Sequence, residues 1–281
     1  MCVRPIPCTP RREINERMNE QRTLDSPGAA DRLVAHLADA AREATVADVR
    51  IGLGYTAVKL ADGRAGVAYT FRDQAQGGCS VFNGIRPLSG RSASDLLALV
   101  ESGDAIEAAV GLACGNALAN CNEPGHLTGD ILEHLEVRPD DDVAMVGNFG
   151  PLVEALRKSA RSLTIFERVT TPTGLLRPQE EAVGALPQCQ VALITATSII
   201  NHTVDVLLDA ARACRQVALV GASTPLVVEA FAATGVTILS GVVVTAPDEV
   251  LRVVSEGGGM RQFSPHVRKV TVRVNRQGST T

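Results

Sequence analysis

Several apolar segments of this chain end in polar residues that could bind a ligand or transfer a proton. Glu167 closes the apolar segment 163–167 and stands twenty residues after Gly147. This is about the spacing at which a carboxylate reaches ribose hydroxyls after a glycine turn. Such a carboxylate could act as an acid, a base or a cation partner. The alternative is a carboxylate that merely ends a strand in solvent or pairs with an arginine. The strand-end position favours a site, so we predict that Glu167 contacts a ligand.

Two segments of nearly identical sequence supply glycine turns. Residues 143–153 and 217–227 agree at seven of eleven positions, and each is typical of a buried strand, a turn and a helix that begins with proline. The first turn contains Gly147, Asn148, Phe149 and Gly150, and the second contains Gly221, Ser223 and Thr224. The N–H groups at a helix start can bind an anion. Serine or threonine before proline is also a common cap, and we expect Ser223 or Thr224 to cap a helix starting at Pro225.

A third segment, 191–203, ends in a group of small polar residues. Thr195, Thr197 and Ser198 follow its strand, and Asn201 and Thr203 precede a helix predicted from residue 204. Capping of that helix explains one of these residues but not all of them. We therefore predict that ligand contacts are found among Thr195, Thr197, Asn201 and Thr203. His202, alone beside a cap, is more typical of a surface or gate residue.

The elements that carry these residues alternate between strand and helix. Strands are predicted at 142–148, 163–167, 190–195, 216–221 and 237–244, and helices at 151–159, 178–186, 203–213, 225–233 and 247–256. Continuous apolar strands joined by helices are typical of a parallel sheet covered on both faces. The fold class is therefore α/β, with a Rossmann-like doubly wound domain whose ligand lies beyond the carboxyl ends of the strands.

The first half of the chain has a different pattern. A helix is predicted at 29–44, short strands at 46–53, 56–60 and 65–71, and helices at 94–101 and 104–120, which together form a small α+β domain. The chain then divides into a mobile arm at 1–28, the small domain at 29–125, the Rossmann-like domain at 126–276 and a tail at 277–281. Gly257 to Gly259 form a loop or helix cap that could act as a lid.

Composition excludes some classes of partner. The formal net charge is −4, tryptophan is missing and aromatic residues make up 3% of the chain, so neither nucleic acid nor a membrane surface is expected as a partner. Seven cysteines without a C-x-x-C pair predict a reduced, cytoplasmic protein. Cys114 and Cys121 lie seven residues apart and could be imagined as soft metal ligands, but an Ala-rich helix favours two small core residues.

The combined motifs resemble the heavy-metal chelatase family over about residues 29–274. The similarity is carried by 52–58 (GLGYTAV), 111–117 (GLACGNA), 146–153 (VGNFGPLV), 166–168 (FER), the ITAT and NHT segments, and 221–226 (GASTPL). The resemblance implies an enolase amino-terminal-like domain, then a Rossmann-like domain, with a site in the cleft between them. The positions it places around that cleft are Asn116, Glu167, Thr195, Asn201, Thr203, Gly221 and Ser223.

Three functions follow from these observations. The first is a protein that binds, and could transform, a metal chelate or its anionic small-molecule ligand, with Glu167 and Asn116 as the catalytic residues. The cofactor would be a metal ion or chelate, with no metal ligands assigned, and we expect a homodimer. The second is a nucleotide- or S-adenosylmethionine-dependent enzyme with Glu167 on the ribose. The third is a regulatory or scaffold protein whose strand-end residues only cap helices.

Overall fold

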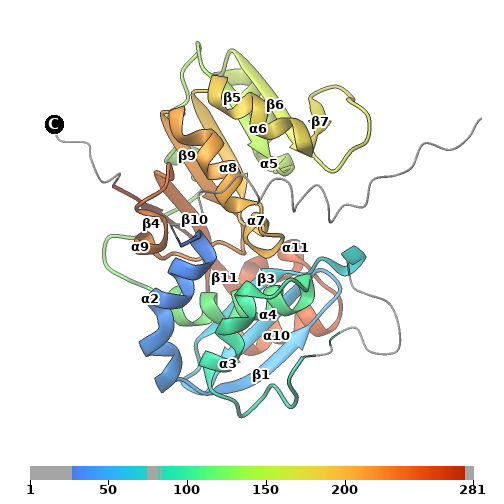
Figure 1. Ribbon diagram of the computed structural model, residues 1–281, viewed down its shortest axis with the longest axis vertical. Helices are drawn as coiled ribbons and strands as arrows, with labels where there is room; N and C mark the ends of the chain where they lie inside the picture. Colours follow the sequence, from blue (N-terminus) through green and yellow to red (C-terminus); the bar gives the residue numbers. More distant parts are fainter. Residues whose placement is uncertain (1–26, 75–81, 83, 276–281) are drawn as a thin grey trace, which may run out of the picture.

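The protein consists of a small antiparallel sheet and a larger, mostly parallel sheet, each packed against helices. The computed structural model describes residues 27–74, 82 and 84–275. Figure 1 shows the larger sheet above the small one, with helices covering both. This arrangement confirms the predicted α/β fold class. The predicted tail and all but the last two residues of the predicted arm lie outside the described residues. No helix in the described ranges has the length and apolar character needed to cross a membrane.

The small sheet is a three-stranded meander in the order β1-β2-β3. Its strands are β1 (Val46–Ile51), β2 (Tyr55–Leu60) and β3 (Ala65–Tyr69), with antiparallel pairing throughout. Helix α4 (Ala105–Ala119) packs against β3, where a Cβ on Gly66 would lie 2.2 Å from the backbone nitrogen of Ala117. Glycine at residue 66 therefore allows the close approach of helix and strand. Helices α2 (Ala29–Glu43) and α3 (Ala93–Leu97) pack beside α4.

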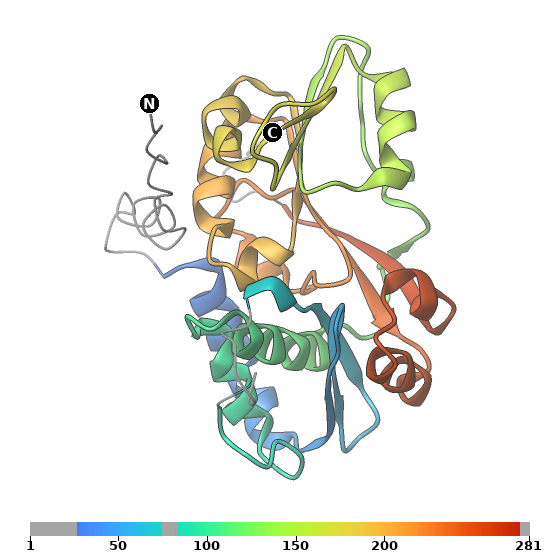
Figure 2. The same cartoon turned by 90° about the vertical axis from the view of Figure 1, so that its right-hand side faces the viewer.

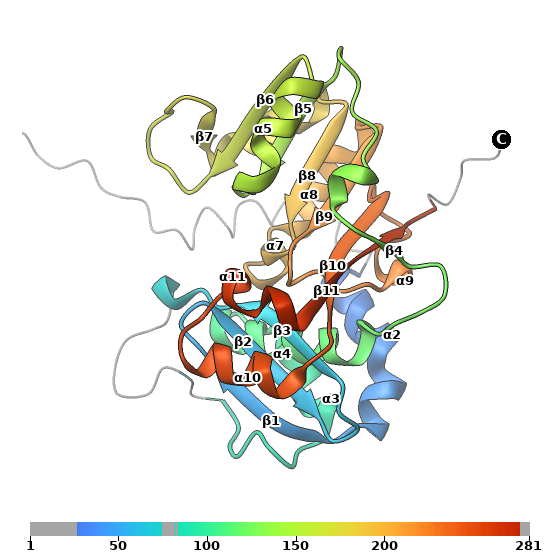
Figure 3. The same cartoon turned by 180° about the vertical axis from the view of Figure 1, so that it is seen from behind.

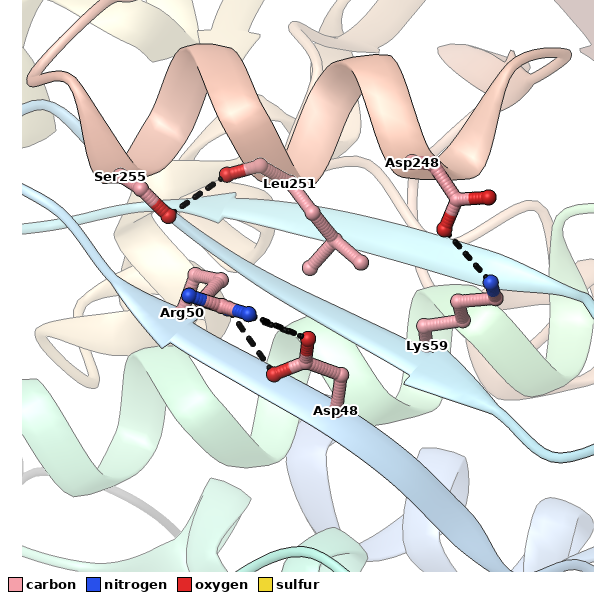
Figure 4. Close-up of polar contacts among 6 residues, drawn as sticks. All are labelled: Asp48, Arg50, Lys59, Asp248, Leu251 and Ser255. Carbon is pink, nitrogen blue, oxygen red and sulfur yellow. Dashed lines mark hydrogen bonds and ion pairs between the residues drawn. The ribbon is translucent and has the colours of Figure 1, made fainter.

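The opposite face of the small sheet is covered by the C-terminal part of the chain. Figure 2 shows helices α10 (Pro247–Ser255) and α11 (Met260–Phe263) on this side of the small sheet. Apolar side chains of both helices form one cluster with those of β2 and β3. Lys59 of β2 donates to Asp248 of α10 at 2.6 Å (Figure 4). Figure 3 shows α10 lying across β1 and β2. Segments on both sides of the predicted domain boundary thus complete one layer, and the boundary itself stays a prediction.

The larger sheet has the strand order β4-β11-β10-β9-β8-β5-β6-β7 over the described residues. Six adjacent strands of this sheet run parallel to one another: β5 (Asp142–Val146), β6 (Ser162–Glu167), β7 (Leu176–Pro178), β8 (Val191–Thr195), β9 (Gln216–Val220) and β10 (Ile238–Val244). Two further strands are antiparallel to their neighbours: β11 (Val267–Arg273) and β4 (Leu127–Thr128). The chain adds strands on one side of β5, then returns to add them on the other side. A topological switch therefore lies between β5 and β8.

Helices cover both faces of this sheet, as a doubly wound fold requires. Helix α5 (Gly150–Ser159) packs on one face, where Met145 and Leu156 belong to one apolar cluster. The other face carries α6 (Ala182–Ala185), α7 (Thr197–Ile200), α8 (Val204–Ala210) and α9 (Val228–Phe231). Short 3₁₀ turns occur at Arg72–Gln74, Ala98–Glu101, Ile131–Glu133, Gln179–Glu181, Leu186–Gln188, Ala211–Ala213 and Ser264–His266.

The helix predicted at 225–233 is present only at its centre, in α9 (Val228–Phe231). Residues 224–227 are not helical, and α9 begins only at residue 228. The buried Asn120 side chain binds this segment instead: its Nδ2 donates to the carbonyl oxygens of Thr224 (2.9 Å) and Val242 (3.1 Å), and its Oδ1 accepts from Leu226 N (2.8 Å). The bond from Leu226 N satisfies an N–H group that a helix start would leave unpaired, and the other two fix the segment against β10.

Candidate functional site

The turn after β5 contacts the end of β8, at the topological switch. Gly147 has φ +92° and donates its N–H to Phe166 O at 2.8 Å. A Cβ on Gly147 would lie 2.9 Å from Cβ of Thr195, so only glycine fits without displacement. Ligands of doubly wound sheets bind at this point, beyond the carboxyl ends of the strands. The fold therefore brings the predicted turn at 147–150 into contact with Thr195, one of the predicted hydroxyl-bearing residues.

Glu167 holds the same turn from the neighbouring strand. Its Oε2 accepts from Asn148 N at 3.0 Å, and its Oε1 accepts from Arg168 N at 2.8 Å. Helix α5 begins at Gly150. Pro151 is therefore its second residue, whereas the sequence had predicted it to be the first. A Cβ on Gly221 would lie 3.9 Å from Cε1 of Phe149. The Phe149 ring thus reaches from the β5 turn towards the end of β9.

The polar groups after β8 mainly bind one another. Thr195 Oγ1 lies 3.0 Å from Thr197 Oγ1, and Ser198 Oγ donates to Thr195 O at 2.7 Å. Asn201 Oδ1 accepts from the Thr203 hydroxyl at 2.7 Å. Thr203 precedes α8, but neither its side chain nor that of Asn201 caps the helix, so the predicted capping is wrong. The residues form a compact hydroxyl-rich turn.

His202 links this turn to the segment between α3 and α4. It adopts φ +57°, a conformation uncommon outside glycine, and its Nε2 lies 2.8 Å from Ser102 O. The contact joins the segment after β8 to the loop before α4. A structural link between the two halves therefore accounts for this side chain.

Ser223, Thr224 and Asn116 lie in the interior. Ser223 Oγ accepts from Tyr69 N at 2.9 Å and caps no helix; its predicted capping role, like that of Thr224, is wrong. Asn116 is 1% exposed and donates its Nδ2 to Val67 O at 2.8 Å. Asn116 Oδ1 and Thr224 Oγ1 are buried without a hydrogen-bond partner among the described residues. Two polar atoms therefore remain unsatisfied in the layer between the sheets.

The predicted residues thus separate into two groups. The residues of the first group are at least partly exposed to solvent at the carboxyl edge of the sheet: Gly147, Asn148, Phe149, Gly150, Glu167, Thr195, Thr197, Asn201 and Gly221. Those that are buried are Asn116, Thr203, Ser223 and Thr224. The first group can meet a ligand directly, whereas the second lies behind it.

Arg168 is a polar residue at this edge that sequence reasoning missed. Its guanidinium carbon lies 4.3 Å from the centre of the Phe71 ring, and its Nη1 lies 3.2 Å from Asp73 Oδ2. The side chain is 28% exposed. It therefore bridges the end of β6 and the segment after β3, with part of its surface open to solvent. Its position directly after the strand-end Glu167 is the signal that could have revealed it.

Aromatic rings continue from Arg168 along the small sheet. Tyr69 makes an edge contact with Phe71 at 5.0 Å between centroids, and Tyr55 makes one with Tyr69 at 5.8 Å. Burial, with a smaller contribution from Tyr69, raises the pKa of Tyr55 to about 12. The Tyr55 hydroxyl therefore keeps its proton above the pH at which an exposed tyrosine loses it.

A separate pocket opens between β5–β7 and α6. It has a volume of about 510 Å³ and is lined by residues that include Ser162, Thr164, Arg177, Glu181 and Cys189. None of the predicted site residues lines it. The pocket lies along the sheet face rather than at the switch between β5 and β8.

Metal-binding groups are sparse in the described ranges. No three or more His, Cys, Asp and Glu side chains there come together in a way that could hold an ion. Cys114 is buried and donates to Ala93 O at 3.6 Å, and burial raises its pKa to about 12. These contacts support the interpretation of Cys114 as a core residue.

Comparison with known proteins identifies a family. Residues 130–273 match the DUF364 family model and residues 34–119 match the DUF4213 model, both described as "Putative heavy-metal chelation". An uncharacterised protein of Methanocaldococcus jannaschii is 26% identical over 189 residues, which cover 66% of this chain and 73% of that protein.

Two solved structures share the fold. A DUF364 protein of unknown function from Pyrococcus horikoshii has a TM-score of 0.76 at 23% identity, covering 88% of this chain and 100% of its own. One from Desulfitobacterium hafniense DCB-2 has a TM-score of 0.73 at 23% identity, covering 94% and 100%. At this identity the likeness establishes the fold alone.

Proposed function

This chain belongs to the DUF364 family, described as "Putative heavy-metal chelation", and on that premise we propose that it binds a metal chelate or its anionic organic ligand. The binding place is the carboxyl edge of β5, β6 and β8, where it meets the small domain. The observation that carries the proposal is the turn of Gly147 to Gly150 at the switch between β5 and β8, held by Glu167 and followed by α5.

Two features attract an anionic group to this edge. The amino terminus of a ten-residue helix such as α5 carries a partial positive charge. Arg168 adds a guanidinium that the Phe71 ring holds in place and whose partner Asp73 is exposed. A ligand carboxylate could exchange with Asp73, because an exposed ion pair is worth only about 1 kcal/mol or less.

A complexed metal suits the edge better than a bare ion. Glu167 and the Thr195 and Thr197 hydroxyls offer a few hard oxygen donors, and the described residues provide no cluster of three stronger ligands. An organic anion would bring most of the metal ligands itself. Glu167 then contacts the cation or transfers a proton, while the buried Asn116 supports the layer behind the ligand.

Equilibrium dialysis tests this proposal. We expect the wild-type protein to bind iron(III) citrate or nickel(II) nitrilotriacetate, and Glu167→Gln and Arg168→Ala each to weaken binding at least about tenfold, equivalent to about 1.4 kcal/mol. Matched controls are Glu154→Gln and Arg252→Ala, which remove exposed charges from outer helix surfaces. Equal binding by all four variants and the wild type would contradict the site.

A nucleotide- or S-adenosylmethionine-dependent enzyme is the second candidate. The observation that favours it is the strand-end Glu167 beside a glycine turn, the arrangement that contacts ribose in dinucleotide-binding folds. A thermal-shift panel of ATP, NAD and S-adenosylmethionine separates the candidates. A ligand present at a hundred times its Kd should add about 2.7 kcal/mol of stability. Stabilisation by an adenosine compound, with none by the chelates, would favour this alternative.

A further inference from the structure

Two cysteines, Cys189 and Cys214, each stand two residues before a strand of one parallel pair, β8 and β9. The ladder begins with Val191 opposite Gln216, and Arg215 N donates to Gln190 O at 2.8 Å just before it. Extending this register back by two residues sets Cys189 opposite Cys214. Neighbouring strands are about 4.8 Å apart, and paired residues of parallel strands direct their side chains to the same face.

Hydrogen bonds place both sulfur atoms against one turn of backbone. Cys189 Sγ donates to Ala185 O at 3.5 Å, and Cys214 Sγ donates to Leu186 O at 3.3 Å. The two acceptors are consecutive carbonyl oxygens where α6 passes into the following 3₁₀ turn. The two thiols therefore face the same small region from adjacent strands.

The separation of neighbouring strands leaves room for an ion between two sulfur atoms. Two metal–sulfur bonds of about 2.3 Å, the length found for zinc, span about 4.6 Å when they lie end to end. This length is close to the separation of about 4.8 Å between neighbouring strands. Soft ions prefer thiolate ligands over the oxygen ligands found elsewhere on this chain.

Charge selects a divalent ion. Cys214 is fully buried, Cys189 is half-buried, and the nearby carbonyl oxygens are negative ends of dipoles. Two thiolates around a divalent ion give a neutral unit, whereas a monovalent ion would leave one uncompensated negative charge in the interior. Cys189 also lines the 510 Å³ pocket, which provides an entry path from solvent.

We infer that Cys189 and Cys214 form a binding site for a soft divalent heavy-metal ion of the mercury(II) type. Each thiol releases its proton to solvent, two sulfur–metal bonds form, and no atom changes oxidation state. The site lies at the opposite end of β8 from Thr195 and does not depend on the chelate site proposed above.

The test uses the full-length, reduced protein loaded with mercury(II) chloride and then exposed to excess glutathione. A bridging pair should retain its ion, because two thiols on one chain compete better than single ones. Native mass spectrometry should find one more mercury on the wild type than on Cys189→Ala or Cys214→Ala. The Cys121→Ala control should keep the wild-type count. Equal counts in the wild type and both site variants would overturn the proposal.

Peptide mapping of the loaded wild type gives a readout that needs no variant. Arg177 precedes proline and resists trypsin, so Cys189 lies in peptide 169–212 and Cys214 in peptide 213–215. The proposal expects one mercury to link these two peptides. Mercury linking only other cysteines would refute it. Unchanged chelate binding by the Cys189→Ala variant would show that the two sites fail or succeed separately.

Discussion

Replacing Gly147 with alanine should damage the turn that positions the proposed site. A non-glycine residue at φ +92° costs about 1–2 kcal/mol. The new Cβ would also lie 2.9 Å from Cβ and 3.1 Å from Cγ2 of Thr195, and such overpacking costs about 1–3 kcal/mol. We therefore expect Gly147→Ala to lower the free energy of unfolding by about 2–5 kcal/mol.

Gly184 in α6 provides a matched control. A Cβ there meets nothing within 4 Å, the residue is helical and no proline directly follows it, so Gly184→Ala should be neutral or stabilise by up to about 1 kcal/mol. Urea denaturation of both variants measures the difference, with an unchanged m-value showing that only stability moved. Thr195→Ser in the Gly147→Ala background removes Cγ2 but keeps Cβ, so it should recover only part of the loss. A Gly147→Ala variant within about 0.5 kcal/mol of the wild type would refute the geometry.

Further predictions concern the layer between the sheets and the titrating groups. Asn120→Ala should cost about 3–5 kcal/mol of stability in urea denaturation, because three buried backbone groups lose their partner. It should cost more than Asn116→Ala, which breaks one hydrogen bond. Equal costs would contradict the role given to the three hydrogen bonds of Asn120. Stability should fall as the pH rises from about 10 to 12, because folded Tyr55 keeps a proton that the unfolded chain loses, and Tyr55→Phe should fall less steeply over that range. Arg161 and then Ser162 hold the pKa of Asp142 at about 2, so its contribution is present above about pH 4 and is lost as the pH falls to 2. The Asp142 side chain is 29% exposed, so Asp142→Asn should cost about 1 kcal/mol or less of stability at pH 7. The free energy of unfolding of this variant should also fall less steeply than that of the wild type as the pH decreases from about 4 to 2. An equally steep fall would contradict this prediction.

The sequence predicted the elements whose signals are local. Apolar runs indicated β5, β6, β8, β9 and β10, and glycine turns marked where two of them end. The spacing from Gly147 to Glu167 correctly predicted that a carboxylate lies at the turn after β5. These features depend on residues close in the chain, which periodicity can detect.

The twin segments show where local signals fail. They share seven of eleven residues, yet 150–159 is helical and 224–227 is not. The difference comes from Asn120, more than a hundred residues away from Leu226. Tertiary hydrogen bonds here override a local preference.

Contacts between distant segments were also beyond sequence reasoning. Arg168 meets Phe71, and Ser223 binds the backbone of Tyr69, across separations that no spacing rule covers. Strand β11 was missed because its buried residues, Val270 and Thr271, are adjacent rather than alternating. An irregular burial pattern of this kind gives no period of two.

The location of the ligand is the central claim, and paramagnetic line broadening tests it most directly. Manganese(II) nitrilotriacetate added to isotope-labelled protein broadens the amide signals nearest to the bound chelate. We predict the strongest broadening at residues 147–150, 167–168 and 195–197, and the loss of this broadening in Glu167→Gln. Broadening centred on the residues that line the 510 Å³ pocket, such as Thr164 and Glu181, would contradict this location.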